Sequence, residues 1–293
     1  DRYGRTHARR MYQQTLDALD TVFADTEGGA RRTGSLRIAA DEEELAGCER
    51  HAAALRRDGF PVETYAGPEG RGLLLPSDGV FDPVRRAKRL AARAQHAGAA
   101  LVTHNEAAEI SGDGVVLADG GSIRARSVVV AVDGGLERVA PEVGGDVRTV
   151  QLQMLATAPL DRRVCERPVY RRVGLDYYQQ TPDRRLFVGG GRDLGVSAEW
   201  LEPGQPPAPT AVVQGYLDDL TASITGSPPI VEHRWAAAVA MSTSGLPVLR
   251  QAASGAWLLG AYSGTGNVIG PMLGATLAAR LTRGQSAALD CWL

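Results

Sequence analysis

The residues best suited to chemistry form a glycine turn near the end of the sequence. Gly264-Thr265-Gly266-Asn267 separates an apolar segment, residues 256–260, from an apolar helical segment, residues 268–281. Glycine lets the backbone approach a ligand closely, and the first N–H groups of a helix have no intrahelical acceptor. The turn therefore predicts a site for negative charge, with a plain strand-to-helix cap as the alternative.

Two kinds of ligand suit such a turn. Gly264 and Gly266, with Gly270, resemble a loose dinucleotide fingerprint, but that fingerprint needs a return strand and an acidic residue about 20 positions later. The sequence reaches Leu293 without a pattern for that return strand. A flavin ring is the better match, because reduction places negative charge near its N1 and C2 carbonyl, where helix-end donors contribute up to ~2 kcal/mol.

The elements that must position this turn follow two patterns. Helical periodicity or capping signals predict helices over residues 3–23, 41–58, 81–97 and 210–224. Short apolar runs predict strands at 34–39, 61–65, 100–103, 115–117, 128–132 and 256–260, and alternation predicts longer antiparallel strands within 148–157, 177–190 and 234–240. The chain is therefore expected to be α/β, α+β overall, with an antiparallel sheet inserted into a nucleotide-binding layer.

Several short motifs occur in an order typical of one enzyme family. They are LLLPSDGVFDP at 73–83, VVVAV with Gly134 at 128–134, LFVGG at 186–190, RW at 234–235, GLP at 245–247 and GAYSGTG at 260–266. Together they resemble the D-amino-acid-oxidase-like FAD oxidoreductases, in particular the branch of the sarcosine, glycine and γ-glutamylputrescine oxidases. The resemblance covers almost the whole chain, and the C-terminal turn is its most specific part.

The resemblance implies a function and a division into domains. It implies oxidation of a primary or secondary amine, or of an amino acid, to an imine by hydride transfer to flavin N5, with dioxygen as the usual acceptor. A partial FAD-binding, Rossmann-like domain is expected at 77–146 and 242–287, interleaved with an antiparallel-sheet substrate-binding domain at 1–76 and 147–241.

Site residues follow by the same resemblance. The adenosine half of FAD is expected near Ala107, Ala131 and Gly134, and the flavin ring or ribityl chain near Gly264, Thr265, Gly266 and Asn267. An aromatic pocket suits amines, so Tyr177, Tyr178 and Trp235 are candidates for its walls, with ordinary packing within the sheet as the alternative. No residue is assigned a catalytic role, because the flavin performs the chemistry.

The sequence also departs from the family. The strand–GxGxxG–helix unit that grips the FAD pyrophosphate has no counterpart here, and position 1 is not Met, so we expect the sequence to begin inside a longer protein. Gly264 stands where glycine-oxidase-like members carry a carboxylate-binding arginine, which implies an amine without a carboxylate in that place. No cysteine lies near Ala237, which implies non-covalent FAD. A non-catalytic or truncated relative that acts as an interaction subunit remains the alternative.

Composition argues against other classes. The net charge of −2 gives no reason to expect nucleic acid, and no apolar run approaches the roughly 20 residues that span a membrane. Three dispersed cysteines and five dispersed histidines support neither a disulfide framework nor a metal site. GAYSG at 260–264 is misspaced for a hydrolase nucleophile elbow. We expect a cytoplasmic protein.

Overall fold

The largest element is an eight-stranded sheet. The computed structural model describes residues 3–25, 27, 29–195, 199–202, 204–284 and 292. The strand order in this sheet is β14-β10-β13-β12-β11-β2-β4-β3. The strands are β2 (Ser35–Ile38), β3 (Glu63–Gly67), β4 (Gly70–Leu75), β10 (Val147–Thr157), β11 (Val169–Arg171), β12 (Asp176–Gln180), β13 (Leu186–Gly190) and β14 (Val231–Ser242). Only β11 and β2 pair in parallel, so the expected antiparallel sheet is confirmed.

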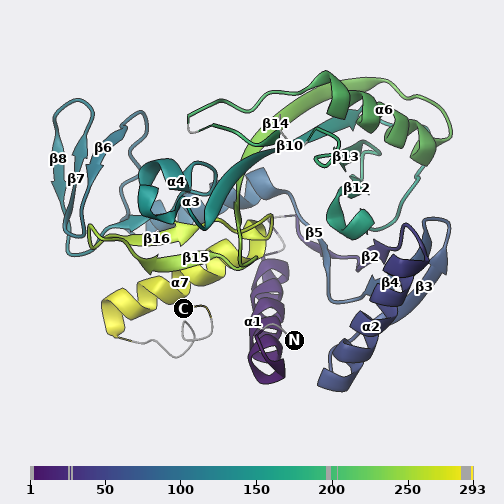
Figure 1. Cartoon of the computed structure of the whole chain (residues 1–293), viewed down its shortest axis with the longest axis horizontal. Helices are drawn as coiled ribbons and strands as arrows, with labels where there is room; N and C mark the ends of the chain where they lie inside the picture. Colours follow the sequence, from purple (N-terminus) through teal and green to yellow (C-terminus); the bar gives the residue numbers. More distant parts are fainter. Residues whose placement is uncertain are drawn as a thin grey trace.

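Three smaller sheets draw on the remaining strands. One has the order β15-β16-β9, from Val248–Gln251, Trp257–Gly260 and Val129–Val130. A second is the meander of β6 (Ala107–Ile110), β7 (Gly114–Leu117) and β8 (Ser122–Arg124). The third pairs β1 (Arg31–Arg32) with β5 (Gly79–Val80). Figure 1 shows that the long strands β10 and β14 connect the region of β15 and β16 with the region of β12 and β13.

The helices begin where the sequence places capping residues. The helix α2 (Glu42–Asp58) starts after Asp41, whose side chain accepts the Glu44 N–H at 2.8 Å, and α3 (Pro83–His96) starts after Asp82 in the same way. The remaining long helices are α1 (Arg5–Ala24), α6 (Ala211–Thr225) and α7 (Gly266–Arg283), and α4 (Leu136–Val139) is a single turn. All five long helices begin and end within about two residues of their predicted ends.

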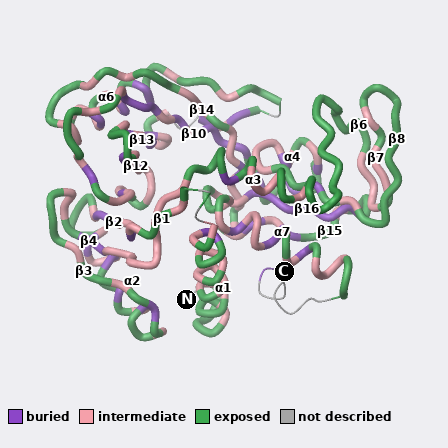
Figure 2. The backbone as a smooth tube through the Cα atoms, turned by 180° about the vertical axis from the view of Figure 1, so that it is seen from behind, coloured by how far each residue is buried: buried purple, intermediate pink, exposed green. Residues whose placement is uncertain are grey.

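Buried residues gather in separate clusters. Beneath α6 the large sheet packs Leu155, Tyr178 and Leu186 against Val213 and Leu217. Another cluster packs α7 against β15 and β16, and a third lies around β9, α4 and the start of β10. Figure 2 shows mostly buried residues along β10 and β16, whereas β6, β7 and β8 are exposed or intermediate.

One predicted strand is absent. Residues 100–103 form no strand, and Leu101 and Val102 are 50% and 68% exposed. An apolar run becomes a strand only when a neighbouring strand exchanges hydrogen bonds with it, and no described strand pairs with residues 100–103. The predicted strand 128–132 is likewise reduced to Val129–Val130, which pairs only with β16 among the described strands.

Candidate flavin and substrate site

The glycine turn lies at the carboxyl edge of two parallel strands. Trp257 and Leu258 of β16 pair with Val129 and Val130 of β9, so both strands end on the same side. A Cβ placed on Gly260 would lie 2.0 Å from the carbonyl oxygen of Val132. Only glycine permits this approach of the two backbones, which brings the loop after β9 against the turn after β16.

The turn itself holds an unfavourable backbone conformation. Ala261, Ser263 and Gly264 have φ values of 52°, 51° and 87°. For the two residues that are not glycine this left-handed conformation costs on the order of 1–3 kcal/mol each, and such residues persist where the surroundings determine them. Ala261 is completely buried. Its surroundings therefore hold it in place.

Asp133 is the anchor of the turn. Its Oδ1 accepts the Tyr262 N–H at 3.0 Å, and its Oδ2 accepts the Ala240 N–H of β14 at 3.2 Å. In return, the Ser263 N–H donates to the Ala240 carbonyl at 3.1 Å. Burial raises the pKa of the Tyr262 phenol to about 12, and the Asp133 charge acts in the same direction. The outer edge of the large sheet is thus clamped to the glycine turn.

The turn leaves several backbone N–H donors without a partner. Within the described residues, the N–H groups of Gly264, Gly266 and Asn267 have no acceptor, because α7 begins at Gly266 and the Thr265 N–H is used by the Tyr262 carbonyl. Gly264, Thr265 and Asn267 are exposed, and a Cβ on Gly264 would meet no atom within 4 Å. The turn therefore fits an electron-rich ring edge such as that of a flavin, which these donors would hold.

The residues assigned to the adenosine half are only partly brought together. Gly134 lies beside the glycine turn, since it follows Asp133 and its Cβ position would be 2.7 Å from the Cβ of Ala238 on β14. Ala131 is exposed between β9 and Asp133. Ala107 is also exposed but begins β6 in the separate meander, and no described contact joins it to the turn.

The three aromatic candidates divide between two faces of the large sheet. Trp235, Met154, Gly189 and Tyr177 occupy directly opposed positions on four neighbouring strands, so they share one face. We call it the open face, because α6 covers the other side. Tyr178 points to the α6 side and is a member of its core, which places it away from Tyr177.

The open face contains one aromatic residue that the sequence patterns do not single out. Phe187 of β13 contacts Trp235 edge-on, with ring centroids 6.2 Å apart. The Tyr177 ring covers the space above Gly189, where a Cβ would lie 2.3 Å from it. Burial raises the pKa of Tyr177 to about 12, so its phenol remains protonated and able to donate. Residues two positions apart in a strand point to the same face, so the spacing of Phe187 and Gly189 could have placed Phe187 on the open face.

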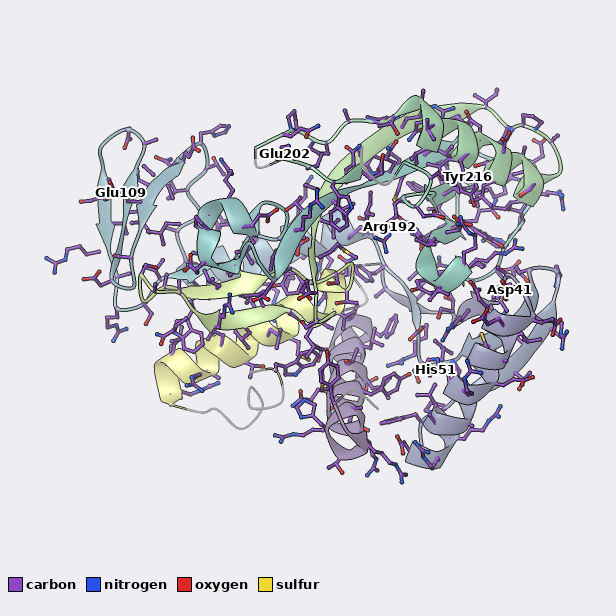
Figure 3. All side chains as sticks on the ribbon, in the orientation of Figure 1. Asp41, His51, Glu109, Arg192, Glu202 and Tyr216 are labelled. Atoms are coloured by element: carbon purple, nitrogen blue, oxygen red, sulfur yellow. The ribbon has the colours of Figure 1, made fainter. Side chains whose placement is uncertain are left out.

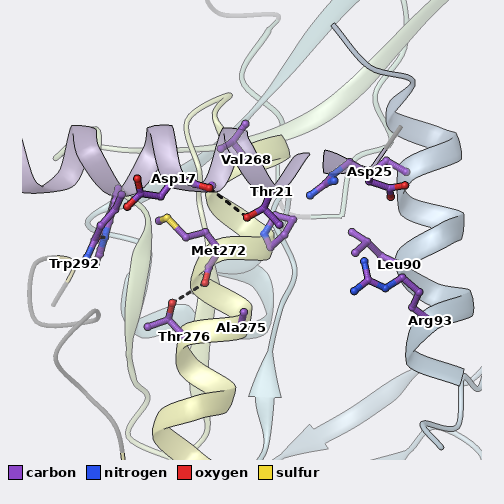
Figure 4. A pocket seen from close by; sticks show the side chains of 14 residues that line it. Asp17, Thr21, Asp25, Leu90, Arg93, Val268, Met272, Ala275, Thr276 and Trp292 are labelled. Carbon is purple, nitrogen blue, oxygen red and sulfur yellow. Dashed lines mark hydrogen bonds between the residues drawn. The ribbon is translucent and has the colours of Figure 1, made fainter. Parts of the chain in front are cut away.

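A separate pocket adjoins the first turns of α7. It has a volume of about 480 Å³ and lies between α1, α3 and α7, where Figure 4 shows Asp17 and Thr21, Leu90 and Arg93, and Met272 and Ala275 from these three helices. Arg86 also lines it, and its buried Nε has no hydrogen-bond partner within the part of the chain that the structure describes. Sequence patterns do not predict this pocket, because three distant segments form it.

Two further kinds of site were sought in the described part of the chain. No three His, Cys, Asp or Glu side chains gather there in a way that would hold a metal ion. None of the described helices has the length and apolar character needed to cross a membrane.

Comparison with solved structures shows the same fold in several enzymes. L-proline dehydrogenase from P. horikoshii superposes with a TM-score of 0.80 at 18% identity, covering 95% of this chain and 80% of that one. Glycine oxidase from Geobacillus kaustophilus gives 0.77 at 20%, covering 94% and 79%. Iminodiacetate oxidase from Chelativorans sp. BNC1 gives 0.76 at 16%, covering 96% and 82%. At these identities the likeness shows the fold.

The family follows from the sequence. None of the curated proteins matches this chain. The model of the DAO family, described as FAD dependent oxidoreductase, matches residues 1–280. The match includes the Asp133 anchor and the glycine turn, and the chain therefore belongs to the DAO family of FAD-dependent oxidoreductases.

Proposed function

We propose that this protein oxidises a primary or secondary amine, or an amino acid, to an imine. Non-covalently bound FAD supplies the hydride acceptor for this reaction, and dioxygen is the final two-electron acceptor. The hydride leaves from the carbon that carries the amine, and the amine nitrogen loses a proton as the C=N bond forms.

The observation that carries this proposal is the clamp between the glycine turn and the sheet. The turn presents unpaired N–H groups, and hydrogen bonds through Asp133 and Ala240 join it to β14. β14 is the edge strand of the large sheet and carries Trp235 on the open face. A ring held by the turn and an amine held on the open face would thus belong to one connected site. A plain helix cap needs neither the left-handed Ala261 nor this clamp.

The structural neighbours support an amine as the substrate class. Their names specify L-proline, glycine and iminodiacetate, each of which carries a primary or secondary amine beside a carbon–hydrogen bond. The aromatic side chains of the open face suit such a group, because an ammonium ion is attracted to an aromatic ring and a neutral amine packs against it.

Non-covalent attachment is supported by the position of the described cysteines. Cys48 lies in α2 and Cys165 under α6, and both are buried. Burial raises the pKa of Cys165 to about 11, which keeps it in the unreactive thiol form. Cys291 lies outside the described residues.

A non-catalytic role as an interaction subunit is the second candidate, and one observation favours it. Within the described residues, β9 pairs on one side only, and the apolar Leu101 and Val102 are exposed. A protein that presents these features permanently would bind another chain rather than a dinucleotide cofactor.

Flavin content and flavin reduction test the proposal. The purified whole protein should be yellow, and its flavin absorbance should bleach when amines such as sarcosine, proline and putrescine are added without oxygen. Gly266→Asp should weaken FAD binding, since a Cβ there already meets the Tyr262 ring at 3.0 Å and the carboxylate would lie beside the reduced ring.

The matched control is Gly274→Asp, two turns further along α7, where a Cβ meets nothing within 4 Å. It should leave FAD binding unchanged. A colourless protein that takes up no added FAD would contradict the flavoenzyme proposal and favour the interaction subunit.

A further inference from the structure

Trp200 extends the large sheet beyond the end of β13. It forms an antiparallel bridge with Val150 of β10, and the Leu201 N–H donates to the Thr149 carbonyl at 3.1 Å. β13 pairs with the same edge of β10 further along that strand. Residues 199–201 therefore lie beside β10 where β13 has already ended.

The neighbours of Trp200 determine the direction of its side chain. Glu199 and Leu201 are buried, with 1% and 5% exposure, whereas Trp200 is partly exposed. Successive residues of an extended segment point to opposite faces, and directly opposed residues share one face. Trp200 is opposed to Val150, which alternation places on the same side of β10 as Met154. The indole is therefore a side chain of the open face.

A buried polar network holds this segment from the α6 side. The Glu199 Oε1 accepts from the Gln153 amide at 2.8 Å, and the Gln153 Oε1 accepts from Gln214 of α6 at 3.0 Å. A buried carboxylate is costly unless hydrogen bonds stabilise it, so these contacts fix the place of Glu199. In Figure 3, Glu202 marks the end of the segment beside the long strands. Trp200 is thus carried by a rigid support.

The strand register places Trp200 across the sheet from the glycine turn. Val150 is paired with Val239 of β14, and the next residue, Ala240, contacts both the turn and its Asp133 anchor through its backbone. The order at this level of the sheet is glycine turn, β14, β10 and Trp200. Neighbouring strands are about 4.8 Å apart, so the backbone of Trp200 lies roughly 10 Å from that of β14. Only valine side chains lie opposite one another on β10 and β14 between them.

Arg148 fixes the indole from one side. Its guanidinium carbon lies 4.6 Å from the centroid of the Trp200 ring, and Arg148 is itself exposed. This cation–π contact stabilises the ring and covers one of its two faces. A molecule bound on the open face can therefore pack only against the other face.

We propose that Trp200 is the wall of the amine pocket opposite the glycine turn and that it limits the size of the substrate. The proposal rests on the amine oxidation and deepens it, because it names the residue that selects among amines. A ring held by the turn and the fixed indole bound the open face from two sides. The wall excludes bulky groups, so the preferred substrates are amines with small alkyl substituents.

Two amines that cannot be oxidised test this wall. In cumylamine a phenyl replaces one methyl of tert-butylamine, and neither compound has a hydrogen on the carbon that carries the amine. Titration calorimetry on the purified whole protein gives the ratio of their dissociation constants. Trp200→Ala should shift this ratio about tenfold or more in favour of cumylamine, because the space of the indole becomes free for the phenyl. Trp200→Phe should shift it in the same direction by a smaller factor, and it decides the test if Trp200→Ala does not fold.

Val212→Ala, exposed on α6, is the control and should leave the ratio unchanged. The proposal is overturned if the Trp200 variants leave the ratio within threefold of the native value, or if they weaken both amines equally. Flavin that propylamine bleaches, together with an unmoved ratio, would leave the amine oxidation standing and remove only the role of Trp200. A ratio that moves as expected, in a protein whose flavin no amine reduces, would remove only the oxidation.

Discussion

The glycine turn and the open face differ in what they are made of. The turn presents backbone N–H groups, and its shape depends on backbone approaches such as that of Gly260 to Val132. The open face presents side chains, Tyr177, Phe187 and Trp235, from three different strands of the large sheet. One region is specified by a few consecutive residues, the other by the register of a sheet.

This difference separates two tasks of the proposed site. A cofactor that stays the same is suited to a rigid backbone cradle, which tolerates almost no substitution. A substrate that changes between relatives is suited to side chains on a sheet, because each can be replaced while the strand hydrogen bonds remain. Substitutions in the turn should therefore reduce stability and flavin content, and substitutions on the open face should alter substrate binding.

The largest effect is expected at Gly260. Gly260→Ala would place a Cβ 2.0 Å from the Val132 carbonyl oxygen and force β9 and β16 apart, at a cost on the order of 3 kcal/mol. Urea unfolding should show the loss, and flavin content should fall with it. Gly274→Ala in α7 is the matched control and should stabilise the protein by about 0.5–1 kcal/mol. Equal stability of the two variants would refute a rigid cradle.

Asp133 should come next. The Asp133 carboxylate accepts hydrogen bonds from the Tyr262 and Ala240 N–H groups. Asp133→Asn keeps the size of the side chain, but its amide NH₂ group would face one of these two donors and could not accept from it. We expect a loss of about 1–2 kcal/mol in unfolding free energy and weaker binding of added FAD. Glu109→Gln, on the exposed β6, is the control. If Asp133→Asn changed stability but left the FAD dissociation constant unaltered, Asp133 would support the fold alone.

A smaller and different effect is expected at Gly189. Gly189→Ala would push the Tyr177 ring off β13, because a Cβ would lie 2.3 Å from that ring. The Michaelis constant for the amine should change by about tenfold, while flavin content stays the same. A loss of flavin in this variant would show that the two regions do not divide the tasks as described.

The smallest effect concerns pH. Burial raises the pKa of Tyr177 and of Tyr262 to about 12, above the value of about 10 for an exposed phenol. The protonated phenol is favoured in the folded state, so this stability is complete below pH 10 and is lost as the pH rises through 12. The unfolding free energy should therefore not vary with pH through these tyrosines between pH 6 and 9. A transition in that range that disappears in Tyr177→Phe would contradict the assignment.

Local signals predicted much of the fold. The acidic caps Asp41 and Asp82 predicted the starts of α2 and α3, because capping depends on residues within one helical turn. The segment 100–103 was predicted wrongly, because a strand also requires a neighbour. Tyr177 and Tyr178 were inseparable as pocket residues in the sequence, since adjacent strand residues point to opposite faces and only the sheet shows which side α6 covers.

The sequence by itself determined the glycine turn, the helix that follows it and the family, because these depend on consecutive residues and short-range backbone geometry. Only the tertiary structure decided that Asp133 holds this turn against β14, and that Phe187 and Trp235 share the open face with Tyr177. Both follow from how the strands are paired. Those properties arise from contacts between distant segments, which no local pattern contains.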